Sequence, residues 1–175
     1  MDLTQYIRTI PDHPKPGILF RDVTTLMGHP DAFRHAVHAI ASEAAAHHCN
    51  KVAGIEARGF IFGGAVATAL GVGFVPLRKP GKLPYQTRSV TYALEYGTDT
   101  LHMHIDAVTS GDRVLVVDDL IATGGTAIAG VELLRSSGGS IAGASFVVDL
   151  PDLGGADKLR ALDVSVHVLC GFSGH

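Results

Sequence analysis

Two adjacent carboxylates stand directly before a glycine-rich stretch in the middle of this 175-residue chain. Asp118 and Asp119 follow the apolar run VLVV, and the stretch ATGGT, residues 122–126, begins after two intervening residues. Because like charges repel, such a pair needs a reason: either a ligand satisfies both acids, or Asp119 caps the turn and Asp118 is simply solvated. Carboxylates accept hydrogen bonds from hydroxyl groups and can hold magnesium through water. The pair therefore predicts a site for a sugar diol beside a cation.

The glycine-rich stretch has the composition of an anion cradle. Glycines allow backbone N–H groups to approach a ligand closely, and a following helix adds unpaired donors and its positive end. No lysine follows the glycines, as it does in nucleoside triphosphate loops, and the spacing differs from the dinucleotide fingerprint. Alone, the stretch fits a tight strand-to-helix turn equally well. Together with the acid pair it predicts a ribose-phosphate site. Its residues are Ala122, Thr123, Gly124, Gly125 and Thr126.

Four further side chains have chemistry worth weighing. Arg58 follows an apolar run, and a guanidinium there can bind phosphate oxygens with two parallel hydrogen bonds, although a lone arginine is more often a surface ion-pair partner. The ring of Phe20 suits stacking on a purine, with ordinary core packing as the alternative. His102 and His104 share one face of an expected strand at a spacing that a metal could use. With no third ligand in sight, we expect an exposed strand instead.

Apolar runs and helical periodicities alternate along the chain and predict the elements that position these residues. We expect helices at 3–8, 30–50, 60–70 and 123–136, strands at 52–55, 74–77, 114–117, 140–150 and 164–169, and a loop at 79–89 followed by a hairpin that turns at 97–99. This alternation predicts an α/β fold with a mainly parallel central sheet flanked by helices. VLVV is apolar at every position, which is typical of a central strand covered on both faces. Ligands of such sheets bind at the carboxyl ends of the strands, where the two acids would lie.

Length and composition favour one domain over residues 1–175, since the net charge is -3 and 46% of the residues are hydrophobic. This charge predicts no nucleic-acid surface. The uncharged stretch 59–77 contains five glycines and Pro76, so we interpret it as a buried helix, a turn and a strand rather than a membrane span. The N-terminus does not have the pattern of a signal peptide, and Cys49 and Cys170 show no ligand spacing. We expect a cytoplasmic protein with no membrane partner.

The stretch VLVVDDLIATGGTA resembles the phosphoribosyl pyrophosphate signature of the type I phosphoribosyltransferases. The stretches GILFRDVTTLM, AGIEARGFIFG, RKPGKLP and YALEYG stand in the order and at the spacing of the adenine-specific branch of that family. The resemblance runs from about Pro14 to Leu134, and the last forty residues carry no motif that we can place. It implies the type I phosphoribosyltransferase fold, with a small hood formed by about residues 1–30 over the base site, a flexible catalytic loop, and a homodimer.

The resemblance also implies roles for single residues. Asp118 and Asp119 would bind the ribose hydroxyls, and residues 122–126 would hold the 5′-phosphate. Adenine would stack on Phe20, with backbone groups of Leu19 and Arg21 reading its edge. The pyrophosphate contacts would be Glu56, Ala57, Arg58, Gly59, Lys79 and Lys82. The two lysines would act in their own or in a neighbouring subunit, and the alternative is that they are solvated loop residues.

The flexible loop would carry Tyr92, Glu95 and Tyr96. Glu95 would either handle the base proton or stabilise the ribosyl cation, and the sequence does not choose between these roles. The implied catalytic residues are Arg58, Glu95, Asp118 and Asp119.

The implied reaction joins adenine to phosphoribosyl pyrophosphate and releases AMP and pyrophosphate. The cofactor would be Mg2+, held by the substrate with water-mediated contacts to the two acids and no direct protein ligand. Two alternatives stay open. One is a transferase for another purine base such as xanthine or guanine. The other is a non-catalytic nucleotide-sensing regulator of the same fold, for which the chain lacks both a basic face and an added domain.

Overall fold

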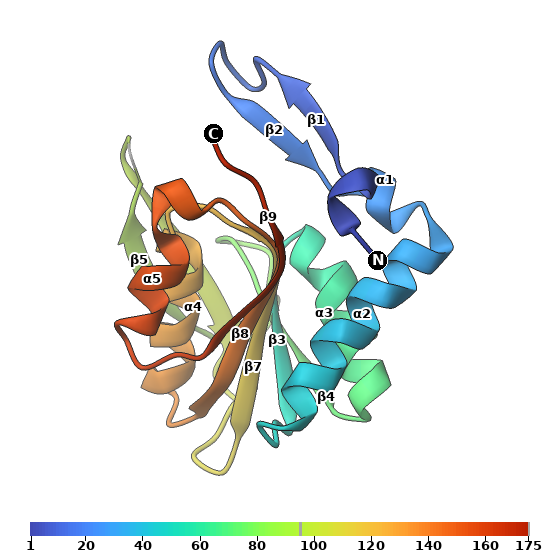
Figure 1. Cartoon of the computed structure of the whole chain (residues 1–175). Helices are drawn as coiled ribbons and strands as arrows, with labels where there is room; N and C mark the ends of the chain where they lie inside the picture. Colours follow the sequence, from blue (N-terminus) through green and yellow to red (C-terminus); the bar gives the residue numbers. More distant parts are fainter. Residues whose placement is uncertain (95, 175) are drawn as a thin grey trace.

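A five-stranded parallel sheet forms the centre of the computed structural model, which describes residues 1–94 and 96–174 (Figure 1). The strand order is β4-β3-β7-β8-β9. The strands are β3 (Lys51–Ile55), β4 (Gly73–Leu77), β7 (Arg113–Ile121), β8 (Ser140–Asp149) and β9 (Val166–Gly171). The predicted α/β architecture with a parallel sheet is confirmed.

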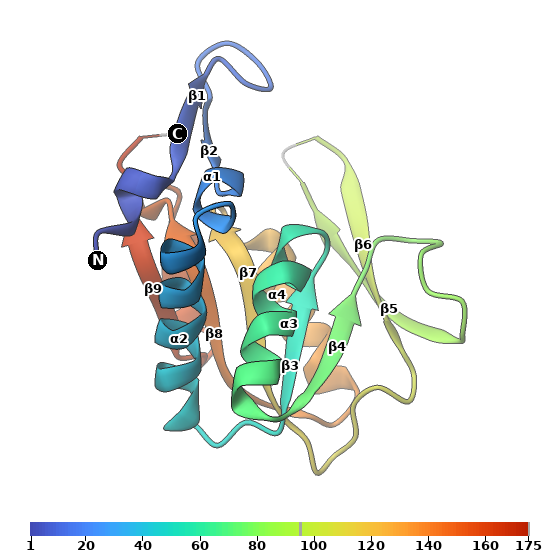
Figure 2. The same ribbon diagram turned by 90° about the vertical axis from the view of Figure 1, so that its right-hand side faces the viewer.

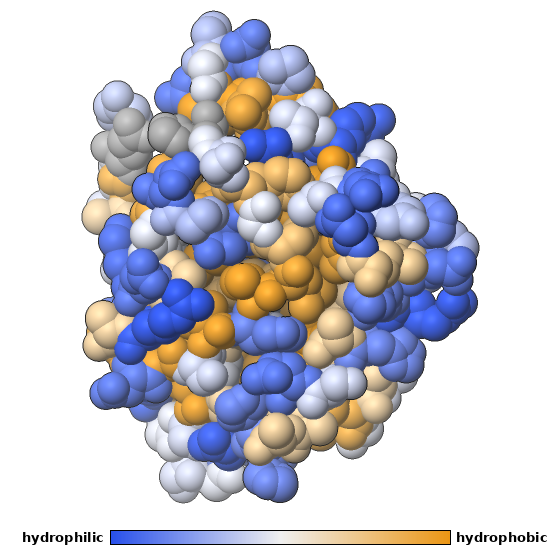
Figure 3. Space-filling model, in the orientation of Figure 1, coloured by the Kyte–Doolittle hydropathy of each residue, from blue (hydrophilic) through white to orange (hydrophobic). Residues whose placement is uncertain are grey.

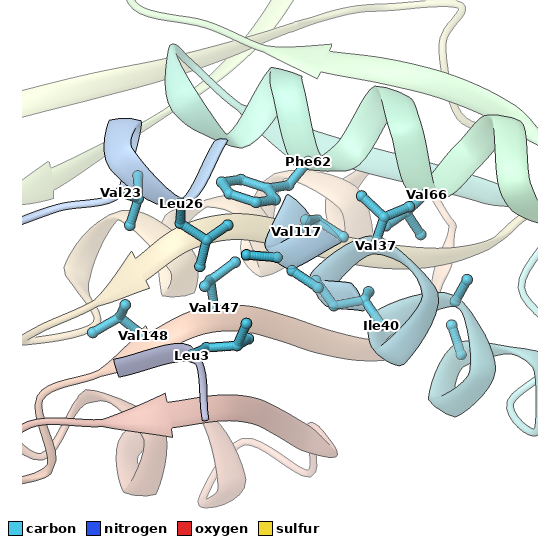
Figure 4. Close-up of a cluster of buried hydrophobic side chains, with 14 of the residues drawn as sticks. Leu3, Val23, Leu26, Val37, Ile40, Phe62, Val66, Val117, Val147 and Val148 are labelled. Carbon is cyan, nitrogen blue, oxygen red and sulfur yellow. The ribbon is translucent and has the colours of Figure 1, made fainter. Parts of the chain in front are cut away.

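The VLVV run lies in the central strand β7, buried on both sides as predicted. Leu115 and Val117 belong to one buried cluster, and Val114 and Val116 belong to the other. Figure 4 shows the first cluster, in which Val117 lies with Phe62 and Ile40 from two covering helices. Because successive strand residues point to opposite faces, a run buried at every position requires cover on both faces.

Helices cover both faces of the sheet (Figure 1). On one side lie α2 (Pro30–Ala45) and α3 (Arg58–Leu70), and on the other lie α4 (Gly125–Ser136) and the short α5 (Gly155–Arg160). The predicted helix at 30–50 is too long by five residues: α2 ends at Ala45, and the backbone of Asn50 already bonds to Arg113 at 2.9 Å. Helix α5 was not predicted, because six residues carry too little periodicity to recognise.

Strand β7 extends further than the sequence predicts. We expected it to end at 117, but it continues to Ile121, and Asp118 pairs with Phe146 of β8. Both acids therefore lie within the strand rather than after it. On its other side β7 pairs with β3 only as far as Val117. The acids thus occupy the part of β7 that projects beyond its shorter neighbour.

The first thirty residues form a projection above the carboxyl ends of the strands (Figures 1 and 2). Its elements are the 3-10 helix η1 (Leu3–Tyr6), the antiparallel strands β1 (Arg8–Pro11) and β2 (Leu19–Asp22), and α1 (Thr24–Met27). The predicted helix at 3–8 is thus wrong beyond Tyr6, since Arg8 begins a strand paired with Asp22. The prolines in this segment mask the short alternating pattern of the strands.

A second hairpin, β5 (Thr87–Ala93) and β6 (Thr98–His104), lies along α4 and reaches the same end of the molecule as the β1–β2 hairpin (Figure 2). The predicted turn at 97–99 is displaced, because Ala93 pairs with Thr98 and Asp99 lies in β6. Stretch 59–77 forms α3 and β4, and none of the helices in the described ranges is long and apolar enough to cross a membrane.

Apolar residues gather near the middle of the face in Figure 3, over the edge strand β9. The side chains of β9 are mostly half-buried, as expected for an edge strand that α2 covers on one face and α5 on the other.

Candidate active site

The direction in which the chain adds strands to the sheet reverses between β3 and β7, so the carboxyl ends of these two strands lie at a topological switch point. From β3 the chain moves outward to β4, whereas from β7 it moves the other way to β8 and β9. In doubly wound sheets the loops after two such strands diverge and leave a crevice for ligands. Residues 56–59 follow β3 and residues 122–126 follow β7, and each segment leads into the N-terminus of a long helix, α3 or α4. The crevice therefore combines two helix N-termini, which favours anions.

The segment after β7 encloses a cavity of about 140 Å³, lined by residues 120–127 and by Asp118. Gly124 has a left-handed φ of 88°, and a Cβ atom there would lie 2.9 Å from the Cα atom of Gly155. The backbone N–H of Gly155 donates to Ala122 at 3.0 Å, and Lys158 Nζ donates to the Thr123 carbonyl at 3.2 Å. The start of α5 thus supports the loop from behind, a contact that is absent from the sequence-based predictions.

Arg58 and Asp119 join the two segments. Arg58 Nε donates to Asp119 Oδ2 at 2.5 Å, across 61 positions of sequence. The Asp119 side chain is 6% exposed, whereas that of Arg58 is 47% exposed. The contact uses Nε, which leaves Nη1 and Nη2 as the pair of donors for a bidentate contact with an anion. The buried acid thus orients the cation toward the crevice.

Asp118 is held differently from its neighbour. It lines the cavity, and its Oδ1 accepts a hydrogen bond from the backbone N–H of Asp119 at 2.9 Å. A Cβ atom at Gly59 would lie 2.7 Å from Asp118 Oδ1, so only glycine lets the first turn of α3 come this close. Burial and the nearby Asp119 carboxylate raise the pKa of Asp118 well above its usual value. In the free protein the charged form of Asp118 is therefore disfavoured, and a cation bound beside it would favour the carboxylate.

Glu56 points away from the crevice toward the next strand. Its Oε1 accepts from the backbone N–H of Lys79 at 2.6 Å and from Arg78 Nε at 3.2 Å. The guanidinium of Arg78 also lies 5.5 Å from the ring centre of Phe60. Glu56 therefore ties the segment after β3 to the end of β4, and Arg78 is a contributor that sequence reasoning missed.

Phe20 lies on β2 with its ring 5.8 Å from the Arg58 guanidinium carbon. The His13 ring meets it edge-on, with the ring centres 5.1 Å apart. The side chain of Arg21 instead bonds to Thr9 Oγ1, at 2.6 Å. The N-terminal projection thus presents one aromatic ring to the crevice beside the cation.

The β5–β6 hairpin is linked to the loop after β7. Tyr92 Oη accepts from Thr126 Oγ1 at 3.2 Å and from Lys79 Nζ at 2.7 Å, and the Lys79 ammonium also pairs with Asp99. These contacts engage the Lys79 ammonium with two residues of the β5–β6 hairpin of the same chain. Asp99 had no part in the sequence prediction.

The remaining loop residues are placed as follows. Lys82 is exposed, Tyr96 is 79% exposed with Lys15 Nζ 5.6 Å from its ring centre, and Glu95 lies outside the described residues.

The two strand histidines have local partners. His102 Nδ1 lies 3.0 Å from Thr87 Oγ1, and His104 Nε2 accepts from the backbone N–H of Tyr85 at 3.3 Å. Across residues 1–94 and 96–174, no cluster of three or more His, Cys, Asp or Glu side chains could hold a metal ion. Hydrogen bonds that order the hairpin thus account for the histidine spacing.

Comparisons with known proteins agree with this geometry. The model of the phosphoribosyl transferase domain matches residues 26–167. The adenine phosphoribosyltransferase of a Bradyrhizobium species is 61% identical over 175 residues, which cover 100% of this chain and 98% of the relative. The chain belongs to the phosphoribosyltransferase family.

Solved phosphoribosyltransferase structures share the whole fold. The adenine phosphoribosyltransferase of Rhodothermus marinus superposes with a TM-score of 0.92 at 51% identity, covering 97% of this chain and 96% of that one. The enzyme of Saccharomyces cerevisiae, complexed with an imino-altritol bisphosphate and adenine, gives a TM-score of 0.90 at 37% identity, with 96% of each chain covered. The predicted type I phosphoribosyltransferase fold is confirmed.

Within this phosphoribosyltransferase, most of the predicted site residues meet in one crevice. Arg58, Gly59, both acids and residues 122–126 surround it, with Phe20 beside Arg58. Glu56 and Lys79 lie at its border but are engaged with other residues of the chain. The contributions of Lys158 and Gly155 fall in the last forty residues, where only the glycine pair at 154–155 hints at a close approach.

Proposed function

We propose that the chain is an adenine phosphoribosyltransferase, which transfers the 5-phosphoribosyl group of phosphoribosyl pyrophosphate to adenine and forms AMP and pyrophosphate. The observation that carries this proposal is the crevice itself, in which a phosphate-sized cavity, two acids, an oriented arginine and an aromatic ring converge. The identity to adenine phosphoribosyltransferases over the whole chain supports adenine as the base. Such an enzyme acts in purine salvage.

The ribose phosphate occupies the part of the crevice after β7 in this proposal. The backbone N–H groups of residues 123–126 and the two threonine hydroxyls surround the 5′-phosphate. Asp118 and Asp119 accept hydrogen bonds from the ribose 2- and 3-hydroxyls. Their loop rests on the start of α5, so the phosphate position is fixed before substrate arrives.

Pyrophosphate lies toward the segment after β3. Arg58, oriented by Asp119, and the backbone of residues 57–59 stabilise the charge that builds on this leaving group. Lys79 and Lys82 supply further cations, and Lys79 can do so only when its pair with Asp99 opens. The oxygen donors of Asp118 and Asp119 fit Mg2+ held by the substrate through water, and the bound ion would neutralise pyrophosphate charge.

Adenine binds between the N-terminal projection and the sheet. Its ring stacks on Phe20, and backbone groups of Leu19 and Arg21 read its edge. A nitrogen of adenine forms a bond to the anomeric carbon while the bond to pyrophosphate breaks, and that nitrogen then loses its proton. Residues 1–30 act as the hood of a single domain in this arrangement.

The β5–β6 hairpin closes over the reacting atoms. Tyr92 links it to Thr126 of the phosphate loop, so closure and phosphate binding are coupled. Tyr96 and Glu95 stand between β5 and β6 in the sequence, and Glu95 either receives the base proton or stabilises the ribosyl cation. Exclusion of water matters because water can intercept an oxocarbenium-like transition state.

A homodimer in the cytoplasm completes the proposal. Exposed apolar side chains on α3 and the edge strand β4 support dimerisation. Among them, Ile61 is 46% exposed and Phe74 is 36% exposed. Large apolar side chains left in water on neighbouring elements are typical of an interface.

A panel of bases tests the proposed specificity. Purified protein with phosphoribosyl pyrophosphate and Mg2+ receives adenine, guanine, hypoxanthine or xanthine, and kcat/KM is compared. We expect adenine to exceed the others by at least about a thousandfold, because an unmatched polar edge leaves buried groups unpaired. A preference for another base would replace adenine in the proposal, and binding without turnover of any base would favour the regulator.

A further inference from the structure

The last described residues run beside the hood, on the side away from the β5–β6 hairpin (Figure 2). We call Phe172, Ser173 and Gly174 the C-terminal strap. It leaves β9 and is fastened to the body of the protein at two points. The Phe172 N–H donates to the Asp149 carbonyl at 3.0 Å, and the Gly174 N–H donates to Asp152 Oδ2 at 2.8 Å.

Arg21 connects this strap to the hood. Its guanidinium carbon lies 4.3 Å from the ring centre of Phe172, within the range of a cation–π contact. Nη2 donates to the Ser173 carbonyl at 3.3 Å, while Nη1 donates to Thr9 Oγ1 of β1 at 2.6 Å. One side chain of β2 therefore bonds to the other hood strand and to the strap at once.

The alternation of β2 places the strap behind the base site. Successive strand side chains point to opposite sides, so Leu19 and Arg21 share one side and Phe20 has the other. Phe20 faces Arg58, whereas Arg21 contacts Phe172, and Leu19 Cδ1 lies at the strap near Gly174. The strap thus supports the strand from the side opposite the ring that meets adenine.

Apart from the strap, the β1–β2 hairpin of the hood has little packing against the body of the protein. Its buried apolar residues, Leu3, Ile7, Val23 and Leu26, lie at its base in the cluster shared with α2 and α3. Strand β1 is largely exposed, and the β1–β2 hairpin projects beyond the sheet in both ribbon views (Figures 1 and 2). A projecting two-stranded hairpin is only marginally stable by itself. Its position depends on what touches its outer side.

We propose that the C-terminal strap positions the base-binding strand β2, with Arg21 and Phe172 as its positioning residues. This inference rests on the proposed function, since it assigns the last residues of the chain to adenine affinity. Loss of the strap lets β2 move, so Phe20 and the backbone of residues 19–21 meet the base less often in the productive geometry. The phosphate loop and Arg58 belong to the body and keep their geometry.

Steady-state kinetics of four variants test the strap. The variants are Arg21→Ala, Phe172→Ala, the double variant, and Ser173→Ala. We expect KM for adenine to rise roughly 5- to 20-fold in each of the first two, as for the loss of a charged contact. KM for phosphoribosyl pyrophosphate should stay within about twofold. Because Arg21→Ala already removes the contact with Phe172, the double variant should lose little more than Arg21→Ala alone. Ser173→Ala keeps the carbonyl and should match the parent.

Two further measurements keep the outcomes distinct. Phe172→Tyr retains the ring and should restore most of the adenine affinity, whereas thermal melting shows whether any variant is broadly unfolded. Equal increases in both KM values, or additive effects in the double variant, would overturn the proposed role of the strap. Unchanged KM for adenine in both single variants would do the same. An inactive parent protein, by contrast, would refute the proposed function itself.

Discussion

Arg58 is the residue on which the proposed leaving-group chemistry depends. Its guanidinium is oriented by a buried acid and is half exposed to the crevice. We predict that Arg58→Ala lowers kcat by roughly 100- to 1000-fold, as for the loss of one preorganised charge stabiliser. The fold should persist, because the side chain is not part of the core. Turnover and circular dichroism of the variant are the measurements, and near-normal turnover would show that pyrophosphate is held elsewhere.

Asp118 carries a stability cost at neutral pH. Its pKa lies above the usual 3.8 because of burial and the Asp119 charge, so the folded state holds this proton more tightly than the unfolded chain. As the pH rises from 3.8 toward the raised pKa, the free energy of unfolding therefore falls. We predict that Asp118→Asn melts at a higher temperature than the parent at neutral pH, with the difference vanishing in acid, while its turnover falls.

Asp119→Asn is the matched control for this prediction. It removes the partner of Arg58 and should lower the melting temperature at neutral pH. Melting curves of both variants from pH 3 to pH 8 test the predicted effect of the Asp118 charge on stability. A decrease for Asp118→Asn as large as that for Asp119→Asn would contradict the raised pKa.

Among the elements, the loop between β7 and α4 shows how backbone shape sets ligand affinity. Gly124 has a positive φ and no room for a side chain against Gly155. We predict that Gly124→Ala raises KM for phosphoribosyl pyrophosphate at least about tenfold, because a Cβ displaces the loop from α5. Gly111→Ala, with open space around it, is the control. Similar kinetics for the two variants would show that the loop does not hold the phosphate.

The amino ends of β3 and β7 are joined by Asp112, far from the crevice. Lys51 Nζ donates to Asp112 Oδ2 at 2.9 Å, and this bond and the Thr109 N–H hold the pKa of Asp112 at about 2. A lowered carboxyl pKa adds stability at pH above 3.8, which is lost as the pH falls through about 2.

We predict that Asp112→Asn lowers the free energy of unfolding by about 1–2 kcal/mol at neutral pH, with less dependence on pH in acid. Denaturant titrations at pH 7 and pH 3 measure both effects. Its kcat and KM should equal those of the parent, since the crevice lies at the opposite end of the sheet. An equal loss of stability at both pH values would contradict the assigned pKa.

The elements that could be predicted from sequence are those with long periodic patterns. Strands β3 and β7 and helices α3 and α4 were recognised, and because both strands end at one edge, their site residues could be brought together in advance. The hairpin β1–β2 and helix α5 were missed, since four-residue strands between prolines and a six-residue helix have little pattern. The Arg58–Asp119 bond spans 61 positions and depends on the sheet order, which periodicity alone does not specify.

At the scale of the whole molecule, the exposed apolar side chains of α3 and β4 bear on assembly. We predict that the protein elutes as a dimer of twice 18.3 kDa, measured by light scattering after size exclusion. Ile61→Asp places a charge among these apolar side chains and should raise the dimer dissociation constant by at least about tenfold. Glu132→Ala, a change on the opposite side of the sheet, serves as control. A monomeric parent at micromolar concentration would contradict the proposed interface.

The hood, the sheet and the β5–β6 hairpin together surround one proposed active site, and formation of the products of the proposed reaction is the most direct test of it. The purified chain is mixed with adenine, phosphoribosyl pyrophosphate and Mg2+, and AMP and pyrophosphate are quantified over time. We expect both products to appear in equal amounts and neither to form when adenine is omitted. Absence of AMP, or release of pyrophosphate at the same rate without adenine, would contradict the proposed reaction.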